Sequence, residues 1–171
     1  MTMQAQERIL IDGETHYMSS EPLSPYLKEH PYNFEVVRKP NGRMTFLGSS
    51  GNHRRYVGTW LIQDNKLWLY SLWSLNNNVA VRWVGDLLEF KPYILNPEGC
   101  EERGLPNPDG PVLAKWYSGF LHVGNGAHKK DSILDIVQEY ERYLVFKISN
   151  GNVEGIRHMT YEETSESGWG F

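Results

Sequence analysis

The polar side chains of this chain that could do chemistry fall into short clusters. His122, His128 and Asp131 stand as His-x5-His-x2-Asp around the segment Gly124-Asn125-Gly126. Imidazole and carboxylate groups are common ligands of zinc. Because this spacing matches no established metal motif, we interpret the three residues as polar loop residues, and we expect neither a metal nor another cofactor.

The residue types that support catalysis are separated from the partners they would need. A nucleophilic cysteine needs positive charge or a paired base, but Cys100 is followed by Glu101 and Glu102. Glycoside hydrolysis needs two carboxylates, yet Glu101 and Glu102 fall on a solvated loop, while Asp86 and Glu89 fall at a turn and on an outer strand face. No Gly-x-Ser-x-Gly elbow or phosphate-binding glycine loop occurs. We therefore predict no catalytic residue.

Two charged segments are candidates for binding. His53-Arg54-Arg55-Tyr56 is a basic and aromatic cluster that could hold a phosphate or stack on a base, and its alternative interpretation is the solvated start of a strand. Residues 96–111 contain four prolines, three glycines and several acidic side chains, and irregular loops of this length are often functional or disordered. With one tryptophan from a strand added, the candidate binding residues are His53, Arg54, Arg55, Trp73, Glu98, Glu101, Glu102 and Asp109.

The elements that position these segments are mostly strands joined by tight turns. Two runs rich in aromatic and aliphatic residues, 55–62 and 67–73, flank the polar turn 63–66 and predict a β-hairpin. With Asp64-Asn65 as the turn, Trp60 faces Leu69 and Ile62 faces Leu67. Three further hairpins are predicted around Asp12-Gly13, Gly85-Asp86 and Asn150-Gly151.

Other strands and helices are predicted from composition and periodicity. Residues 112–123 form a further strand with a bulge or close contact at Gly119, and residues 34–37 form an edge strand. Residues 21–30 form a short helix that Pro31 stops. Residues 131–140 form a longer helix, because its apolar side chains fall at helical spacing; they are Ile133, Ile136, Val137 and Tyr140.

These elements predict an α+β fold. We expect a mainly antiparallel, strongly twisted or half-barrel sheet, with the 131–140 helix packed across it and a short N-terminal helix near Leu23. Alternation places Trp60 and Trp68 on opposite faces of their hairpin. Tryptophans on the second face either enter a second core layer or form an exposed aromatic binding surface.

Composition limits the class of protein. The chain of 171 residues fits a single β-rich domain over 1–160 with a mobile polar tail at 161–171. Its net charge of −4 argues against non-specific nucleic-acid binding, and its one cysteine allows no internal disulfide. With no secretory signal and no long apolar run, we expect a cytoplasmic protein that does not enter a membrane.

Three motifs resemble those of a known family. They are Tyr17-Met18-x3-Pro22-Leu23-x2-Tyr26, then Arg55-Tyr56-x-Gly58-x-Trp60-x-Ile62 leading to Lys66-Leu67-Trp68-Leu69, and Trp116-Tyr117-Ser118-Gly119. Together they resemble a family of small, uncharacterised bacterial proteins with an Arg-Gly-Tyr-x3-Trp-x-Ile hairpin and a later Trp-[Phe/Tyr]-[Ser/Thr]-Gly element. This chain lacks the glycine of the family's Arg-Gly-Tyr element, because Arg55 directly precedes Tyr56. The resemblance spans about residues 17–153 and implies a β-rich fold and a bacterial cytoplasmic origin, but no activity.

The leading functional hypothesis is a non-enzymatic protein-binding module. We expect an inhibitor or immunity-type protein that holds a bacterial toxin domain or another protein, because an acidic surface steers association with basic partners. The alternative is a small-molecule-binding protein or enzyme with an aromatic-lined pocket at one end of the sheet. Self-association through an exposed aromatic face is a third possibility.

Overall fold

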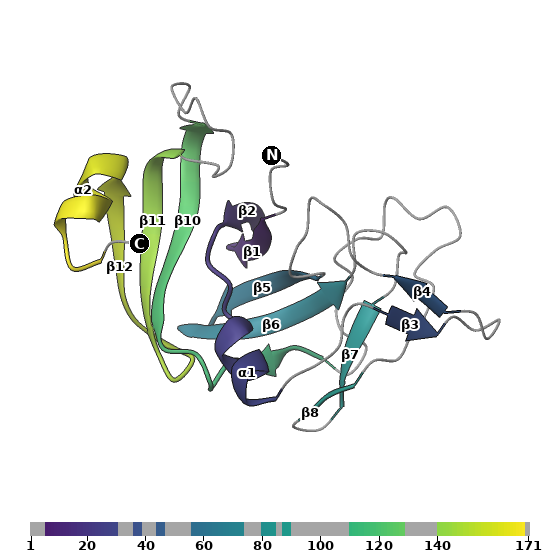
Figure 1. The fold of residues 1–171 in the computed structure, drawn as a ribbon. Helices are drawn as coiled ribbons and strands as arrows, with labels where there is room; N and C mark the ends of the chain where they lie inside the picture. The colour runs from purple at the N-terminus through teal and green to yellow at the C-terminus, as the bar shows by residue number, and fades with distance from the viewer. Residues whose placement is uncertain are drawn as a thin grey trace.

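The structure is a computed structural model, and it describes residues 6–30, 36–38, 44–46, 56–73, 80–84, 87–89, 110–128 and 140–169. Most of the described chain is β-strand (Figure 1). The long strands β10, β11 and β12 run side by side, and β5 and β6 cross them at a large angle.

The first hairpin is confirmed. It joins β1 (Glu7–Ile11) to β2 (Glu14–Met18), and its turn residues Asp12 and Gly13 have φ angles of 51° and 79°. Two successive residues with positive φ make the tight turn that suits the twist of antiparallel strands. The Asp-Gly pair therefore defined this turn correctly.

The central hairpin is confirmed together with its register. It joins β5 (Val57–Gln63) to β6 (Lys66–Trp73). Asp64 and Asn65 form the turn with φ angles of 54° and 55°. Trp60 lies opposite Leu69, as predicted, and a bulge between Thr59 and Trp60 shifts the register of the later pairs.

The remaining two hairpins are also present. β11 (Tyr140–Ser149) pairs with β12 (Asn152–Thr160), and β7 (Ala80–Val84) pairs with β8 (Leu87–Glu89). The turn before β12 needs Gly151, because its φ is 80° and a Cβ there would lie 2.9 Å from the carbonyl oxygen of Ala114.

Two strand predictions were only partly right. The expected edge strand at 34–37 is β3 (Val36–Arg38), which pairs with β4 (Met44–Phe46) in a separate two-stranded sheet. The expected strand at 112–123 is divided into β9 (Val112–Leu113) and β10 (Gly119–His128). A turn separates them, in which the backbone N–H of Tyr117 donates to the carbonyl of Ala114 at 3.0 Å.

The sheet closes into a seven-stranded barrel, so the predicted half-barrel α+β fold is wrong. Hydrogen-bonded neighbours follow the order β12-β11-β10-β2-β1-β5-β6, and β6 returns to β12. The pair Asn152–Lys66 closes the ring, flanked by bonds of 2.8 Å from Leu67 N–H to Gly151 O and from Val153 N–H to Asn65 O. Closure gives both edge strands a partner, which an open sheet would leave unpaired.

The two described helices are short, and neither one packs across the sheet in the way that was predicted for the helix at 131–140. α1 (Ser24–Glu29) is the expected N-terminal helix, and α2 (Tyr161–Glu166) occupies the start of the segment expected to be a polar tail; each has six residues. The helix predicted at 131–140 lies outside the described residues except for Tyr140, which instead begins β11. Neither described helix is long and apolar enough to cross a membrane.

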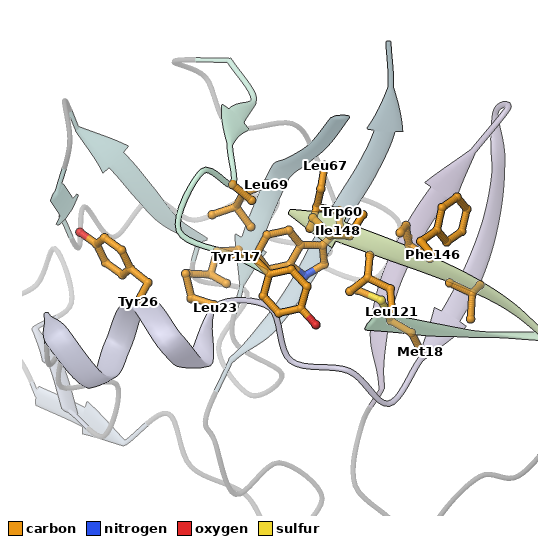
Figure 2. Close-up of a cluster of buried hydrophobic side chains, with 14 of the residues drawn as sticks. Met18, Leu23, Tyr26, Trp60, Leu67, Leu69, Tyr117, Leu121, Phe146 and Ile148 are labelled. Carbon is orange, nitrogen blue, oxygen red and sulfur yellow. The ribbon is translucent and has the colours of Figure 1, made fainter. Parts of the chain in front are cut away.

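The interior of the barrel is filled by apolar side chains. Trp60 of β5 is completely buried and lies in the middle of the cluster that Figure 2 shows, together with Met18 of β2 and Leu121 of β10. Trp68 points to the other face of the hairpin, where its indole N–H donates to the carbonyl of Gln63 at 3.1 Å. The predicted separation of the two tryptophans is therefore confirmed.

Candidate binding groove

The described part of the chain does not gather the predicted binding residues. His53, Arg54, Arg55, Glu98, Glu101, Glu102 and Asp109 all lie outside the described residues. Trp73 ends β6, where its backbone lies between Val57 of β5 and Ala80 of β7. The candidate site that the structure describes is therefore formed by other residues.

The histidine examined as a metal ligand has a structural role. His122 is buried on β10, and its Nε2 lies 2.8 Å from the carbonyl oxygen of Trp169, so this nitrogen carries a hydrogen and donates it. Within the described ranges, no three His, Cys, Asp or Glu side chains come close enough together to hold a metal ion. His128 ends β10, and Asp131 lies outside the described residues.

An open groove of about 680 Å³ lies at one end of the barrel. Its floor comes from the β1–β2 turn and from the end of β5 with its following turn. One wall comes from β11 and β12, which extend past these turns. The lining residues are Ile11, Asp12, Gly13, Leu61, Ile62, Gln63, Asp64, Asn65, Leu144, Phe146, Ile156 and His158.

The wall is apolar because β11 and β12 turn one face inward along their length. Phe146 lies opposite Ile156, and Leu144 lies opposite His158, so these four side chains share the inner face. Phe146 reaches the core and is only 1% exposed, whereas its cross-strand neighbour Ile156 is 52% exposed. The core of the barrel thus continues into the groove as a surface that water reaches.

The groove is open because β12 extends beyond its pairing with β6, the strand that closes the barrel. The ladder between β6 and β12 has one pair, Lys66 with Asn152, and the β5–β6 turn reaches Val153. Beyond that point, β11 is the only strand paired with β12 among the residues that the structure describes. The second half of β12 therefore presents one edge and an exposed isoleucine to solvent.

The charge of the groove is negative. Asp12 and Asp64 stand in the two turns of the floor, both in exposed positions, and none of the lining residues that the structure describes is a lysine or arginine. Amide side chains from Gln63 and Asn65 add hydrogen-bonding groups beside them. An apolar wall facing two carboxylates suits a ligand that carries both aliphatic and cationic groups.

A smaller pocket of about 240 Å³ continues the groove along β12. His158 lines both spaces. Asn125, Arg142 and Thr160 lie side by side across β10, β11 and β12 and line this second pocket together with Glu163 of α2. The two spaces therefore adjoin at His158, and the second one contains the cation Arg142 beside the carboxylate of Glu163.

Buried polar groups elsewhere in the barrel support the fold. Glu7 is 1% exposed, and its carboxylate accepts hydrogen bonds from the backbone N–H of Gly58 and, at 3.4 Å, from the indole N–H of Trp60. Gly58 is required here, because a Cβ would lie 2.5 Å from that carboxylate. Thr59 and Ser71, opposite each other on β5 and β6, bury hydroxyls that have no hydrogen-bond partner among the residues that the structure describes.

Sequence patterns had identified the turns and strands of the groove without identifying the groove. Asp12 and Asp64 were read as turn residues, and Ile156 as a strand residue. The one local signal was the run Ile156-Arg157-His158, because it puts an isoleucine among charged and polar residues in a strand that follows a hairpin turn. No protein-family model, curated protein or solved structure is significantly similar to this chain.

Proposed function

We propose that this protein is a non-enzymatic recognition module that binds a cationic protein partner through the groove at the end of its barrel. The observation that carries the proposal is the combination of the half-exposed Ile156 with the carboxylates of Asp12 and Asp64 in one groove, whose described lining residues include no lysine or arginine. Large apolar side chains exposed beside a charged rim are typical of protein-interaction surfaces. The role fits an inhibitor or immunity-type protein that holds a basic toxin domain.

The filled barrel interior supports recognition of a surface over enclosure of a small ligand. The inner faces of the described strands are occupied by side chains such as Trp60, Leu67 and Leu121, all completely buried. A cofactor or metabolite site typically encloses most of its ligand. The groove is open along one side and offers a wall rather than a closed pocket.

Charge-matched bait variants test the proposal. Wild-type protein, the double variant Asp12→Asn/Asp64→Asn and the single variant Ile156→Arg are used to capture proteins from cells of the native host. Glu29→Gln/Glu166→Gln is the control, because it removes the same two charges from the exposed surface of the two helices. We expect a basic protein that the wild type and the control retain and that both groove variants lose. If no captured protein depends on the groove residues, the proposal is wrong.

A small-molecule ligand is the second candidate, and the volume of the groove favours it. Ligand sites commonly measure about 300–1,000 Å³, and the groove measures about 680 Å³. Among the described lining residues, the apolar side chains are aliphatic apart from Phe146, and none is a tryptophan or tyrosine, so the groove differs from the aromatic pocket expected from the sequence. Mass spectrometry of the denatured, freshly purified protein would support this candidate if a small molecule is released by the wild type but not by Ile156→Arg.

A further inference from the structure

We infer that the partner contributes an extended segment that adds as a strand to the free edge of β12, next to the groove. The inference rests on the proposed function and specifies how the groove is used. The edge consists of residues 154–160, between the closing contact at Val153 and the start of α2 at Tyr161. In an added strand, main-chain hydrogen bonds supply affinity and alternate side chains supply specificity.

The geometry of β12 provides the main-chain groups for such pairing. On one side, residues Gly155–Thr160 pair continuously with β11. On the other side, no described strand is paired with them, so every second residue directs its N–H and C=O groups away from β11. An antiparallel addition continues the line of β6, which is itself antiparallel to β12 where the two strands meet.

The groove determines which side chains the added strand carries. Its inward side chains enter the groove beside Ile156 and His158, against the apolar wall that includes Phe146. Its C-terminal end comes next to Val153 and therefore next to the turn that carries Asp64. The fitting segment thus alternates, with apolar inward residues followed by an inward lysine or arginine towards its C-terminal end.

The outer face of β12 disfavours lysine or arginine at the outward positions of the added segment, because it already carries the cation Arg157. Arg157 points to this outer face, where its guanidinium carbon lies 4.3 Å from the centre of the Trp169 ring. A lysine or arginine placed across from Arg157 would add like charge, which is unfavourable between cross-strand neighbours. The outward residues of the segment are therefore neutral or acidic, and the two faces together define a pattern.

The pattern is tested by selection from a random octapeptide display library on the whole protein. We expect the selected peptides to alternate, with apolar and basic residues at one set of positions and neutral or acidic residues at the other. Selected peptides should bind Ile156→Arg at least about tenfold more weakly. They should bind Tyr17→Arg normally, because Tyr17 is a comparably exposed apolar side chain, 45% against 52%, outside the groove lining.

Backbone N-methylation then separates strand addition from simple groove binding. A selected peptide is made in two forms, each methylated at alternate amides. One form blocks the amides that face β12 and should bind at least about tenfold more weakly, since two or three hydrogen bonds are lost. The other form should bind within about twofold of the parent peptide.

Three outcomes overturn the inference. Equal binding by the two methylated forms, with dependence on Ile156 and Asp64 retained, rejects strand addition and leaves the proposed function standing. Selected peptides in which apolar and basic residues do not alternate with neutral or acidic ones also reject strand addition and leave the proposed function standing. If no peptide selected from the library depends on the groove residues, both the inference and the proposed function are rejected.

Discussion

The two faces of β12 beyond Val153 are covered very differently. On the outer face, the chain returns after β12, and Trp169 lies over Gly155, Arg157 and Phe120. On the inner face, Ile156 and His158 line an open groove. The same strand thus has one face covered by the C-terminal segment and one face that lines an open groove.

The closed face shows how the chain covers a surface when no partner is needed. Thr160 caps the start of α2, because its hydroxyl accepts a hydrogen bond from the N–H of Glu163 at 3.3 Å. The segment then places the carbonyl of Trp169 against buried His122. An aromatic ring, a cation and a buried hydrogen bond act together there, whereas the described part of the inner face has no equivalent cover. This difference between the two faces is the reason why the proposed function places the partner on the inner face.

The largest expected contrast is between two cross-strand neighbours. Phe146→Ala should lower the free energy of unfolding by about 3–5 kcal/mol, because it empties a fully buried site. Ile156→Ala, directly opposite, should cost less than about 1 kcal/mol, because half of that side chain already contacts water. Urea unfolding of both variants measures the difference. Equal losses would mean that Ile156 belongs to the core and that the inner face is not open.

The next effect concerns the cover of the outer face. Trp169→Ala should lower the free energy of unfolding by about 1–3 kcal/mol, because it removes the ring on which the Arg157 guanidinium stacks and which contacts Phe120. Gly155→Ala should cost about 1 kcal/mol, because its Cβ would lie 2.9 Å from the Trp169 ring.

The double variant tests whether these two effects share one contact. With the indole removed, Gly155→Ala should cost almost nothing, so a double-mutant cycle should give a coupling of about 1 kcal/mol. Trp169→Phe is the control, since it keeps a ring but shortens it away from Gly155. Additive losses in the cycle would show that Trp169 does not cover β12 in solution.

The smallest expected effect lies at the closed first half of β12. There the N–H of Gly151 donates to the carbonyl of Tyr117, whose hydroxyl donates to the carbonyl of Phe120, both at 3.0 Å. Burial raises the pKa of Tyr117 from 10.0 to about 12. Because the folded state holds this proton more tightly than the unfolded state, its contribution is complete below pH 10 and is lost as the pH rises towards 12.

Tyr117→Phe isolates that contribution. The variant should be less stable at pH 7 by about 1 kcal/mol, from the lost hydrogen bond. Between pH 10 and 11.5, the wild type should lose stability faster than the variant, because only the wild type carries this phenol. Urea unfolding at pH 7, 10 and 11.5 gives the comparison. If the free energy of unfolding depends on pH in the same way for both proteins, Tyr117 is not buried in the folded state.

Much of the local structure followed from the sequence. Asp12-Gly13, Asp64-Asn65 and Asn150-Gly151 identified hairpin turns, and the structure gives each of these pairs positive φ angles. Alternation then fixed the register of Trp60 against Leu69. These features depend on neighbours in the chain, so residue type and spacing suffice to predict them.

The closure of the barrel could not be predicted in this way. Lys66 and Asn152 lie far apart in the sequence, and nothing in either strand specifies that they pair. The apolar spacing at 131–140 was interpreted as a helix, although Tyr140 already belongs to β11 and packs with Tyr143. Tyr140 fits the apolar spacing of a helix and also the start of a strand, and its pairing with His128 of β10 decides for the strand at this residue.

By itself, the sequence determined that this chain forms antiparallel hairpins and that Trp60 and Trp68 lie on opposite faces of one of them, because turn chemistry and side-chain alternation act over a few residues. Only the tertiary structure decided that the sheet closes at Lys66 and Asn152, that Trp169 returns to cover one face of β12, and that Ile156 meets Asp12 and Asp64 in a groove. These juxtapositions arise where distant strands end at different heights around the barrel, and strand length and stagger are properties of the assembled sheet.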